Sequence, residues 1–214
     1  MIVTLLGSSG LVGAYCTKEL LKTSFVTSLI LPVRTLPEVP ETDARVKYQV
    51  VDFDRLQDTP EVFKADAVIC CLGTTLKKAK SKKNREKVDL RIPLSAAAVA
   101  KANKVPHFIA VSAMGASPHS WMHYNRTKGH LESGLEMLAF PSLTILRPSL
   151  ILGERKEKRF GEDLLKKLFE RAPHAVPAFW RPVHAESLAR AITASLENPP
   201  VGKRTLYNRL LIYF

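Results

Sequence analysis

The first thirteen residues place the strongest constraint on the fold. A short apolar run, MIVTLL, leads directly into GSSGLVG at residues 7–13, and a helix-like pattern follows. A strand that ends in a glycine-rich turn before a helix is a common way to cradle a pyrophosphate. Gly7 permits a tight turn, Gly10 lets the backbone approach a phosphate, and Gly13 lets the helix pack closely. The helix N-terminus then offers free N–H groups to an anion.

The glycine spacing narrows the kind of phosphate site. It is G-x-x-G-x-x-G, which differs from the G-x-G-x-x-G of ordinary dehydrogenases. A Walker-type phosphate loop is excluded, because no Gly-Lys-Ser or Gly-Lys-Thr follows the glycines. A glycine-rich turn without a ligand stays open as the alternative.

Strand-like and helix-like segments alternate along the chain. We expect strands over 1–6, 27–33, 46–51, 66–72, 107–111, 143–146 and 205–214. We expect helices over 10–22, 84–103, 124–137, 162–171 and 186–196, with a kink at Pro93 in the second of them. The alternation predicts one α/β domain over residues 1–214, a parallel sheet with helices on both faces and a small C-terminal layer. Residues 149–204 are expected to form a small substrate-side subregion.

Composition excludes several classes of protein. Of the 214 residues, 46% are hydrophobic, yet no apolar run approaches the roughly 20 residues that span a bilayer. The N-terminal apolar stretch is too short for a signal peptide and has no basic n-region, so we expect a cytoplasmic protein. Cys16, Cys70 and Cys71 are expected to be reduced, and no metal site is expected.

The net charge of +12 is concentrated in one place. Residues 77–91 hold eight basic and two acidic side chains, a net charge of +6. Three interpretations stay open: a mobile flap that attracts an anionic substrate, a contact for nucleic acid or an acidic partner, and a solvated loop with a helix start. No aromatic residue interleaves the basic ones, which argues against a stacking platform for single-stranded nucleic acid.

Residues at predicted strand ends are candidates for binding a dinucleotide. Arg34 stands where many such proteins place an acid for the ribose 2′-hydroxyl, and a guanidinium favours a 2′-phosphate, hence NADP(H) over NAD(H). A solvated arginine is the alternative. Asp52 and Phe53 lie where an adenine would rest, and the alternative for Asp52 is a loop acid that caps a turn. Gly73, Thr74 and Thr75 follow the predicted strand 66–72 and are further candidates, because they lie at the same carboxyl edge of the predicted sheet.

Tyr124 and Lys128 are four residues apart, so they share one face of the predicted helix. A cation beside a phenol favours its ionisation, and a hydroxyl that contacts both phenol and substrate completes a proton path. Ser112, at the end of the fifth strand, is the candidate for that hydroxyl.

Six motifs together resemble one family. They are GSSGLVG at 7–13, CLGTT at 71–75, VSAMGA at 111–116, YNRTKG at 124–129, LRPS at 146–149 and VHAESLARA at 183–191. The chain is similar to atypical, extended short-chain dehydrogenase/reductases, above all to the Tat-interacting-protein-like NAD(P)-binding proteins and their small bacterial relatives.

The resemblance implies a fold and a site. It implies a Rossmann-like doubly wound parallel sheet with strand order 3-2-1-4-5-6-7. It also implies a catalytic triad of Ser112, Tyr124 and Lys128 and a nicotinamide ribose held by Lys128. The implied cofactor-binding residues are Gly7, Ser9, Gly10, Leu11, Val12, Gly13, Arg34, Asp52, Phe53, Gly73, Thr74, Thr75, Tyr124, Lys128, Pro148 and Ser149.

The expected activity is hydride transfer between NADP(H) and a carbonyl or alcohol. The small-molecule substrate is expected to be anionic if 77–91 is a flap, and nucleic acid is the less favoured partner. A homodimer is left open, because only about 65 residues follow Pro148 to build a substrate pocket. The alternative function is an NADP(H)-sensing regulatory protein without turnover.

Overall fold

The structure is a computed structural model that describes residues 1–153, 177 and 179–214. The expected helix over 162–171 lies outside the described residues. The strands are β1 (Ile2–Leu6), β2 (Ser28–Val33), β3 (Val46–Val50), β4 (Ala67–Cys70), β5 (His107–Val111), β6 (Ser142–Arg147), β7 (Ile151–Leu152), β8 (Val183–His184) and β9 (Gly202–Tyr207). The helices are α1 (Leu11–Leu21), α2 (Leu76–Ala79), α3 (Lys82–Glu86), α4 (Ile92–Ala102), α5 (His123–Met137), α7 (Ala185–Glu197) and α8 (Asn208–Leu211), with short turns of helix at Leu56–Asp58 and Pro60–Phe63.

Seven strands form one parallel sheet in the order β3-β2-β1-β4-β5-β6-β9. The expected Rossmann-like fold and its strand order are therefore confirmed, with β9 as the seventh strand. The strand order reverses at β1, whose neighbours are β2 and β4. In open α/β sheets this is where ligands bind, outside the carboxyl ends of the strands.

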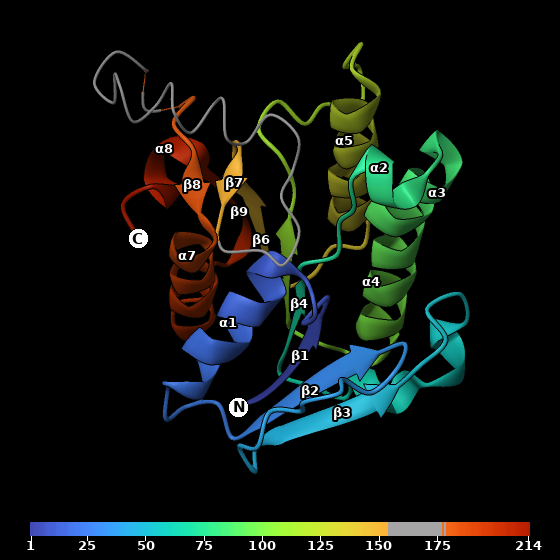
Figure 1. Cartoon of the computed structure of the whole chain (residues 1–214), viewed down its shortest axis with the longest axis vertical. Coiled ribbons are helices and arrows are strands. Elements are labelled where there is room, and N and C mark those ends of the chain that lie inside the picture. Colours follow the sequence, from blue (N-terminus) through green and yellow to red (C-terminus); the bar gives the residue numbers. More distant parts are fainter. Residues whose placement is uncertain (154–176, 178) are drawn as a thin grey trace.

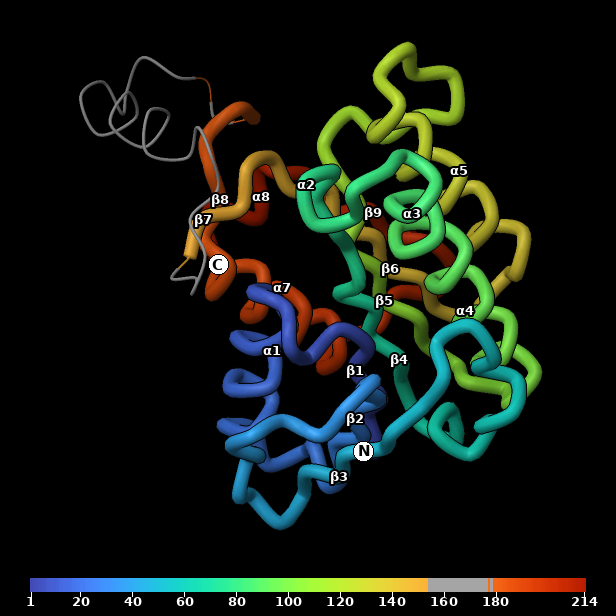
Figure 2. The backbone as a smooth tube through the Cα atoms, turned by 45° about the vertical axis from the view of Figure 1, so that its right-hand side comes forward, coloured from blue at the N-terminus to red at the C-terminus, as the bar shows by residue number. Residues whose placement is uncertain are grey.

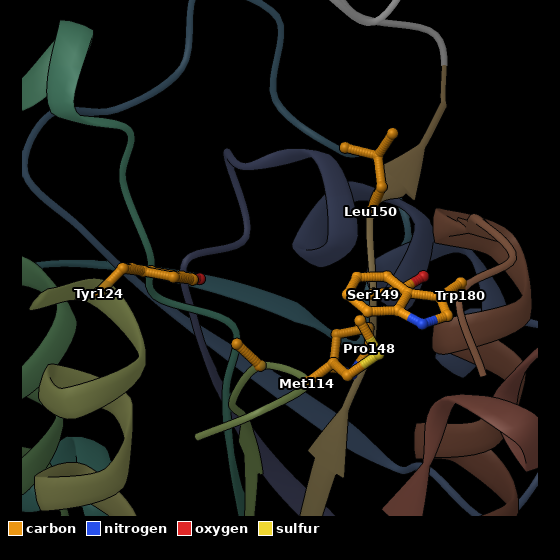
Figure 3. Close-up of a pocket in the computed structure, with 7 residues that line it drawn as sticks. Met114, Tyr124, Pro148, Ser149, Leu150 and Trp180 are labelled. Atoms are coloured by element: carbon orange, nitrogen blue, oxygen red, sulfur yellow. The ribbon is translucent and has the colours of Figure 1, made fainter. Parts of the chain in front are cut away.

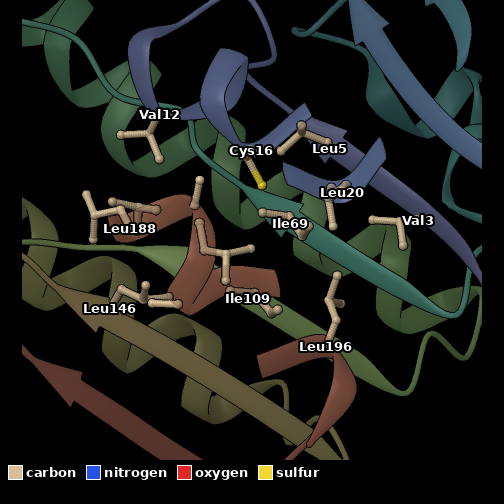
Figure 4. Close-up of a cluster of buried hydrophobic side chains, with 14 of the residues drawn as sticks. Val3, Leu5, Val12, Cys16, Leu20, Ile69, Ile109, Leu146, Leu188 and Leu196 are labelled. Carbon is tan, nitrogen blue, oxygen red and sulfur yellow. The ribbon is translucent and has the colours of Figure 1, made fainter. Parts of the chain in front are cut away.

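Helices cover both faces of the sheet, with α1 and α7 on one face and α4 and α5 on the other (Figures 1 and 2). On the first face, Leu20 and Leu188 pack with side chains of β1, β4, β5 and β6 in a cluster that excludes water (Figure 4). Burying such a leucine fully contributes about 1.5–3 kcal/mol relative to leaving it exposed. Cys70 and Cys71 lie in the clusters on opposite faces, as alternation along a strand predicts, and all three cysteines are free thiols.

The helix expected over 84–103 is present, but it is not one regular α-helix. After the separate short α2, the segments α3, a π-helical turn over Lys87–Arg91 and α4 follow one another with helical backbone at each junction. Pro93 lies in the first turn of α4 and does not kink its middle. Proline has no N–H to donate to the carbonyl four residues back, which accounts for the interruption of the regular α-helical hydrogen bonds just before Pro93.

The expected strand over 205–214 is wrong beyond Tyr207, because the chain turns into α8. The helical turn directs Leu211 into the core, where it is fully buried. It also buries Asn208, whose side chain accepts a hydrogen bond from Ser149 N–H at 2.8 Å and donates to Arg181 O at 2.8 Å. These long-range contacts are invisible in the local pattern.

Part of 149–204 belongs to the main layers, since α7 packs on α1 and β9 joins the large sheet. Its described remainder includes a separate pair of parallel strands, β7 and β8. The idea that this region forms a substrate-side subregion stays a prediction. No helix among the described residues is long and apolar enough to cross a membrane.

Candidate functional site

The glycine turn has a shape that only glycine permits. Gly7 has a φ of +83°, and a Cβ placed there would lie 3.0 Å from the carbonyl carbon of Cys71. A Cβ on Gly13 would lie only 2.1 Å from the carbonyl oxygen of Gly7, so the start of α1 rests directly on the turn. Gly10 N–H donates to Gly7 O at 2.9 Å and closes the turn.

The N-terminus of α1 is open to an anion. Its N-cap is Gly10, which makes no side-chain capping bond, and the first helical turn contains no acid. The N–H groups of Leu11, Val12 and Gly13 therefore have no capping side chain to satisfy them. Free N–H groups with the helix dipole behind them fit a pyrophosphate.

A buried ion pair lies behind the predicted catalytic tyrosine. Lys128 Nζ is 3.1 Å from Asp89 Oδ1, and the two side chains are 2% and 0% exposed. Burial alone disfavours the ammonium, but Tyr124 and Asp89 outweigh it and raise the pKa of Lys128 above its ordinary value. Lys128 therefore stays charged at neutral pH and lies close enough to Tyr124 to act on it electrostatically.

Asp89 is a site residue that the sequence reasoning missed. It lies in the π-helical turn, and its Oδ2 accepts a hydrogen bond from Thr74 N–H at 3.4 Å. Such π turns are common at functional sites. The available signal was an acid between two apolar residues, Val88 and Leu90, within the basic stretch, because a carboxylate that becomes buried needs a cation.

Ser112 lies in a different environment from the one predicted for it. It is buried, and its hydroxyl donates a hydrogen bond to Glu132 on α5. Glu132 also pairs with Arg147, whose Nε donates to Oε1 at 3.0 Å. The cavity beside Tyr124 is lined by Ala113 and not by Ser112. The structure thus brings Tyr124 and Lys128 together, while the Ser112 hydroxyl points to Glu132.

A cavity of about 340 Å³ opens beside Tyr124. Figure 3 shows the phenol oxygen of Tyr124 directed into it from one side, with Pro148 and Trp180 on the opposite side. Ser149 also lines the cavity, but its hydroxyl donates to Arg181 O at 2.6 Å. Tyr124, Pro148 and Ser149, which the resemblance implies, therefore share one cavity.

The residues predicted to hold the adenosine end lie at the ends of β2 and β3. Arg34 is exposed, with its guanidinium 5.7 Å from the centroid of the Phe53 ring. Asp52 accepts a hydrogen bond from Asp54 N–H at 2.9 Å, as a turn-capping acid does. Their contact with a cofactor stays a prediction.

The threonines after Gly73 have local partners. Thr75 caps α2 by accepting from Lys78 N–H at 3.2 Å, while the backbone of Thr74 reaches Asp89. The basic segment 77–91 thus forms the two short helices and the π-helical turn, at the end of α4 near α5 (Figures 1 and 2). Arg85 from this segment lies over the Tyr124 ring, 5.4 Å from its centroid.

The comparisons with known proteins agree with this geometry. A family model described as NAD(P)H-binding matches residues 7–199. The chain is 33% identical to the protein HTATIP2 of Rattus norvegicus over 198 residues, which cover 92% of this chain and 80% of that protein. It is 34% identical to the mitochondrial protein FMP52 of Meyerozyma guilliermondii over 201 residues, covering 89% and 83%.

Solved structures share the fold. The Bordetella bronchiseptica enzyme WbmH in complex with NAD⁺ superposes with a TM-score of 0.72 at 16% identity, covering 96% of this chain and 75% of that one. The oxidoreductase ylbE of Lactococcus lactis superposes with a TM-score of 0.69 at 19% identity, covering 100% and 95%. At these identities the likeness shows the fold alone.

Proposed function

The chain belongs to the NAD(P)H-binding family, and on that premise we propose that it is an NADP(H)-dependent oxidoreductase acting on a carbonyl or alcohol. The observation that carries the proposal is the position of Tyr124. Its phenol faces a cavity, and the buried, charged Lys128 lies behind it. Carbonyl reduction needs a general acid, and a phenol held beside a fixed cation can serve as one.

The mechanism assigns each step to a residue of the chain. When bound, the nicotinamide cofactor supplies the hydride that reduces the carbonyl carbon. Tyr124 gives its phenolic proton to the carbonyl oxygen, which completes the alcohol. Lys128 stabilises the phenolate that remains, and Asp89 holds the ammonium in place at 3.1 Å. Solvent then returns the proton to Tyr124.

Replacing Tyr124 with phenylalanine tests this mechanism. The change removes one hydroxyl and keeps the ring, so folding and cofactor affinity should persist. Turnover on a panel of aldehydes, ketones and quinones should fall by roughly a hundredfold or more, the usual scale for losing a general acid. Turnover that persists unchanged in the variant would rule out this proton path.

We further propose that Arg34 selects NADP(H) over NAD(H). The support is an exposed guanidinium at the end of β2, free to form a bidentate contact with a 2′-phosphate. Arg34→Asp should reverse the preference in calorimetric titrations with NADPH and NADH. Lys22→Asp makes the same charge change at the far end of α1 and should leave the preference unaltered. Equal affinities in the wild type would refute the assignment.

One observation favours the second candidate, an NADP(H)-sensing protein without turnover. The Ser112 hydroxyl donates to Glu132, and the neighbouring Ala113 lines the cavity in place of Ser112. The Ser112 hydroxyl therefore does not face a substrate oxygen in this structure. If the wild type oxidises NADPH with no member of the panel while the nucleotide changes its oligomeric state or partner affinity, this candidate replaces the enzyme.

Two further proposals concern the location of the protein in the cell and its oligomeric state. We propose a cytoplasmic protein that forms a homodimer, while relatives such as FMP52 of Meyerozyma guilliermondii are named mitochondrial. Cell fractionation and light scattering test the two points separately. Recovery in a mitochondrial fraction would overturn the first, and a monomer at micromolar concentration the second.

A further inference from the structure

A second cavity lies next to the first. Its volume is about 310 Å³, and it is lined by Met114, Phe179, Tyr207 and Arg209 among others. Met114 lines both cavities, so the space beside Tyr124 adjoins the second cavity at this side chain. Phe179 and Trp180 are tilted against each other, with ring centroids 5.7 Å apart, and each lines one of the two cavities.

The first cavity offers few hydrogen bonds to a ligand. Its side chains are mainly hydrocarbon or aromatic, namely Ala113, Met114, Pro148, Leu150 and Trp180. The Ser149 hydroxyl is engaged with Arg181 O, which leaves the Tyr124 phenol as the hydroxyl directed inward. A polyhydroxylated ligand would lose hydration here without replacement, whereas an apolar or aromatic body would be stabilised.

The second cavity adds a positive charge. Arg147 also lines it, but its charge is balanced by Glu132 and it lies over the Tyr207 ring at 5.7 Å. Arg209 is exposed at the start of α8, and no acidic side chain of the described residues pairs with it. Among the described residues that line the second cavity, Arg209 is therefore the cation without an acidic partner, and it lies next to the aromatic rings of Phe179 and Tyr207.

We propose that the two cavities form one binding site for an aromatic carbonyl compound with a carboxylate at its far end. The carbonyl lies at Tyr124, the aromatic body passes Met114 along the Trp180 and Phe179 rings, and the carboxylate pairs with Arg209. The carbonyl part rests on the proposed function. The carboxylate part rests only on the second cavity and its cation.

The test compares an acid with its ester. The probes are 4′-formylbiphenyl-4-carboxylate and its methyl ester, which share the same aromatic aldehyde and differ at the far end by the negative charge and one methyl group. With NADPH present, kcat/KM for the acid should exceed that for the ester by about tenfold or more, because a charge-assisted hydrogen bond is strong. Arg209→Glu should lower kcat/KM for the acid by about tenfold or more and so remove its advantage over the ester. Lys22→Glu makes the same charge change away from the cavity and should preserve the advantage. A preference that survives Arg209→Glu overturns the proposal.

A binding measurement separates this inference from the proposed function. The chain has two tryptophans, so Trp121→Phe leaves Trp180 as the reporter at the cavity. Quenching of its fluorescence by the acid, lost in Arg209→Glu, supports the site even if no turnover occurs. Turnover without any dependence on Arg209 keeps the oxidoreductase and overturns the site. UDP-glucose serves as a polyhydroxylated anion, and tighter binding of it than of the acid also overturns the proposal.

Discussion

Breaking the Asp89–Lys128 ion pair should destabilise the fold strongly. Asp89→Asn keeps the shape of the side chain and leaves the Lys128 ammonium 2% exposed and without its counterion. Removing one partner of a buried pair costs about 3–5 kcal/mol, a large share of the roughly 5–15 kcal/mol that stabilises a domain. The pKa of Lys128 is raised above 10.5 in the folded state, so its contribution is present in full at neutral pH and is lost only as the pH rises through the folded value.

Urea unfolding at pH 7, followed by circular dichroism, measures the loss. A double-mutant cycle with Lys128→Met isolates the interaction, because the doubly substituted protein has no buried charge left at this position. We expect each single change to cost several kcal/mol and the pair to cost less than their sum by about 2 kcal/mol or more.

A surface pair provides the matched control. Lys203 and Glu136 are 2.9 Å apart, and both side chains are 45% exposed. Glu136→Gln should change the free energy of unfolding by no more than about 0.5 kcal/mol, because water screens the charge. If Asp89→Asn costs as little as this control, or if the two single effects simply add, the argument from burial fails.

Three further predictions concern single residues. Burial and the nearby Arg204 lower the pKa of His107 from 6.5 to about 4, so the unfolded state takes up the proton before the folded state does. The free energy of unfolding should therefore fall by about 3 kcal/mol as the pH drops from 6.5 to 4. In acid-unfolding curves, His107→Gln should remove this dependence on pH. Gly13→Ala puts a Cβ 2.1 Å from Gly7 O and should weaken NADPH binding in calorimetry by at least about tenfold, with unchanged affinity arguing against the cradle. Ser112→Ala removes a hydrogen-bond donor from buried Glu132 and should lower the free energy of unfolding by about 1–3 kcal/mol. It should reduce turnover less than Tyr124→Phe does. If the two variants lose turnover equally, Ser112 is a catalytic residue after all.

Local spacing predicted the features that lie within one element or one turn. The glycines at 7, 10 and 13 predict a turn that packs against its own helix, and the structure has that turn. The four-residue interval between Tyr124 and Lys128 predicts a shared helix face, and Tyr124 acts on Lys128 electrostatically. The alternation of strands and helices likewise predicts the parallel sheet.

The partners of these residues were decided by the tertiary structure. Asp89 meets Lys128 because the π-helical turn before α4 lies against α5, and Ser112 meets Glu132 because β5 packs under the same helix. The tail becomes α8 because Leu211 finds a place in the core. The spacing of residues predicts which side chains share a face within one segment, and the resemblance to the family predicted the order of the strands. Which side chains face each other across two packed elements depends on their register and crossing, which no single segment encodes.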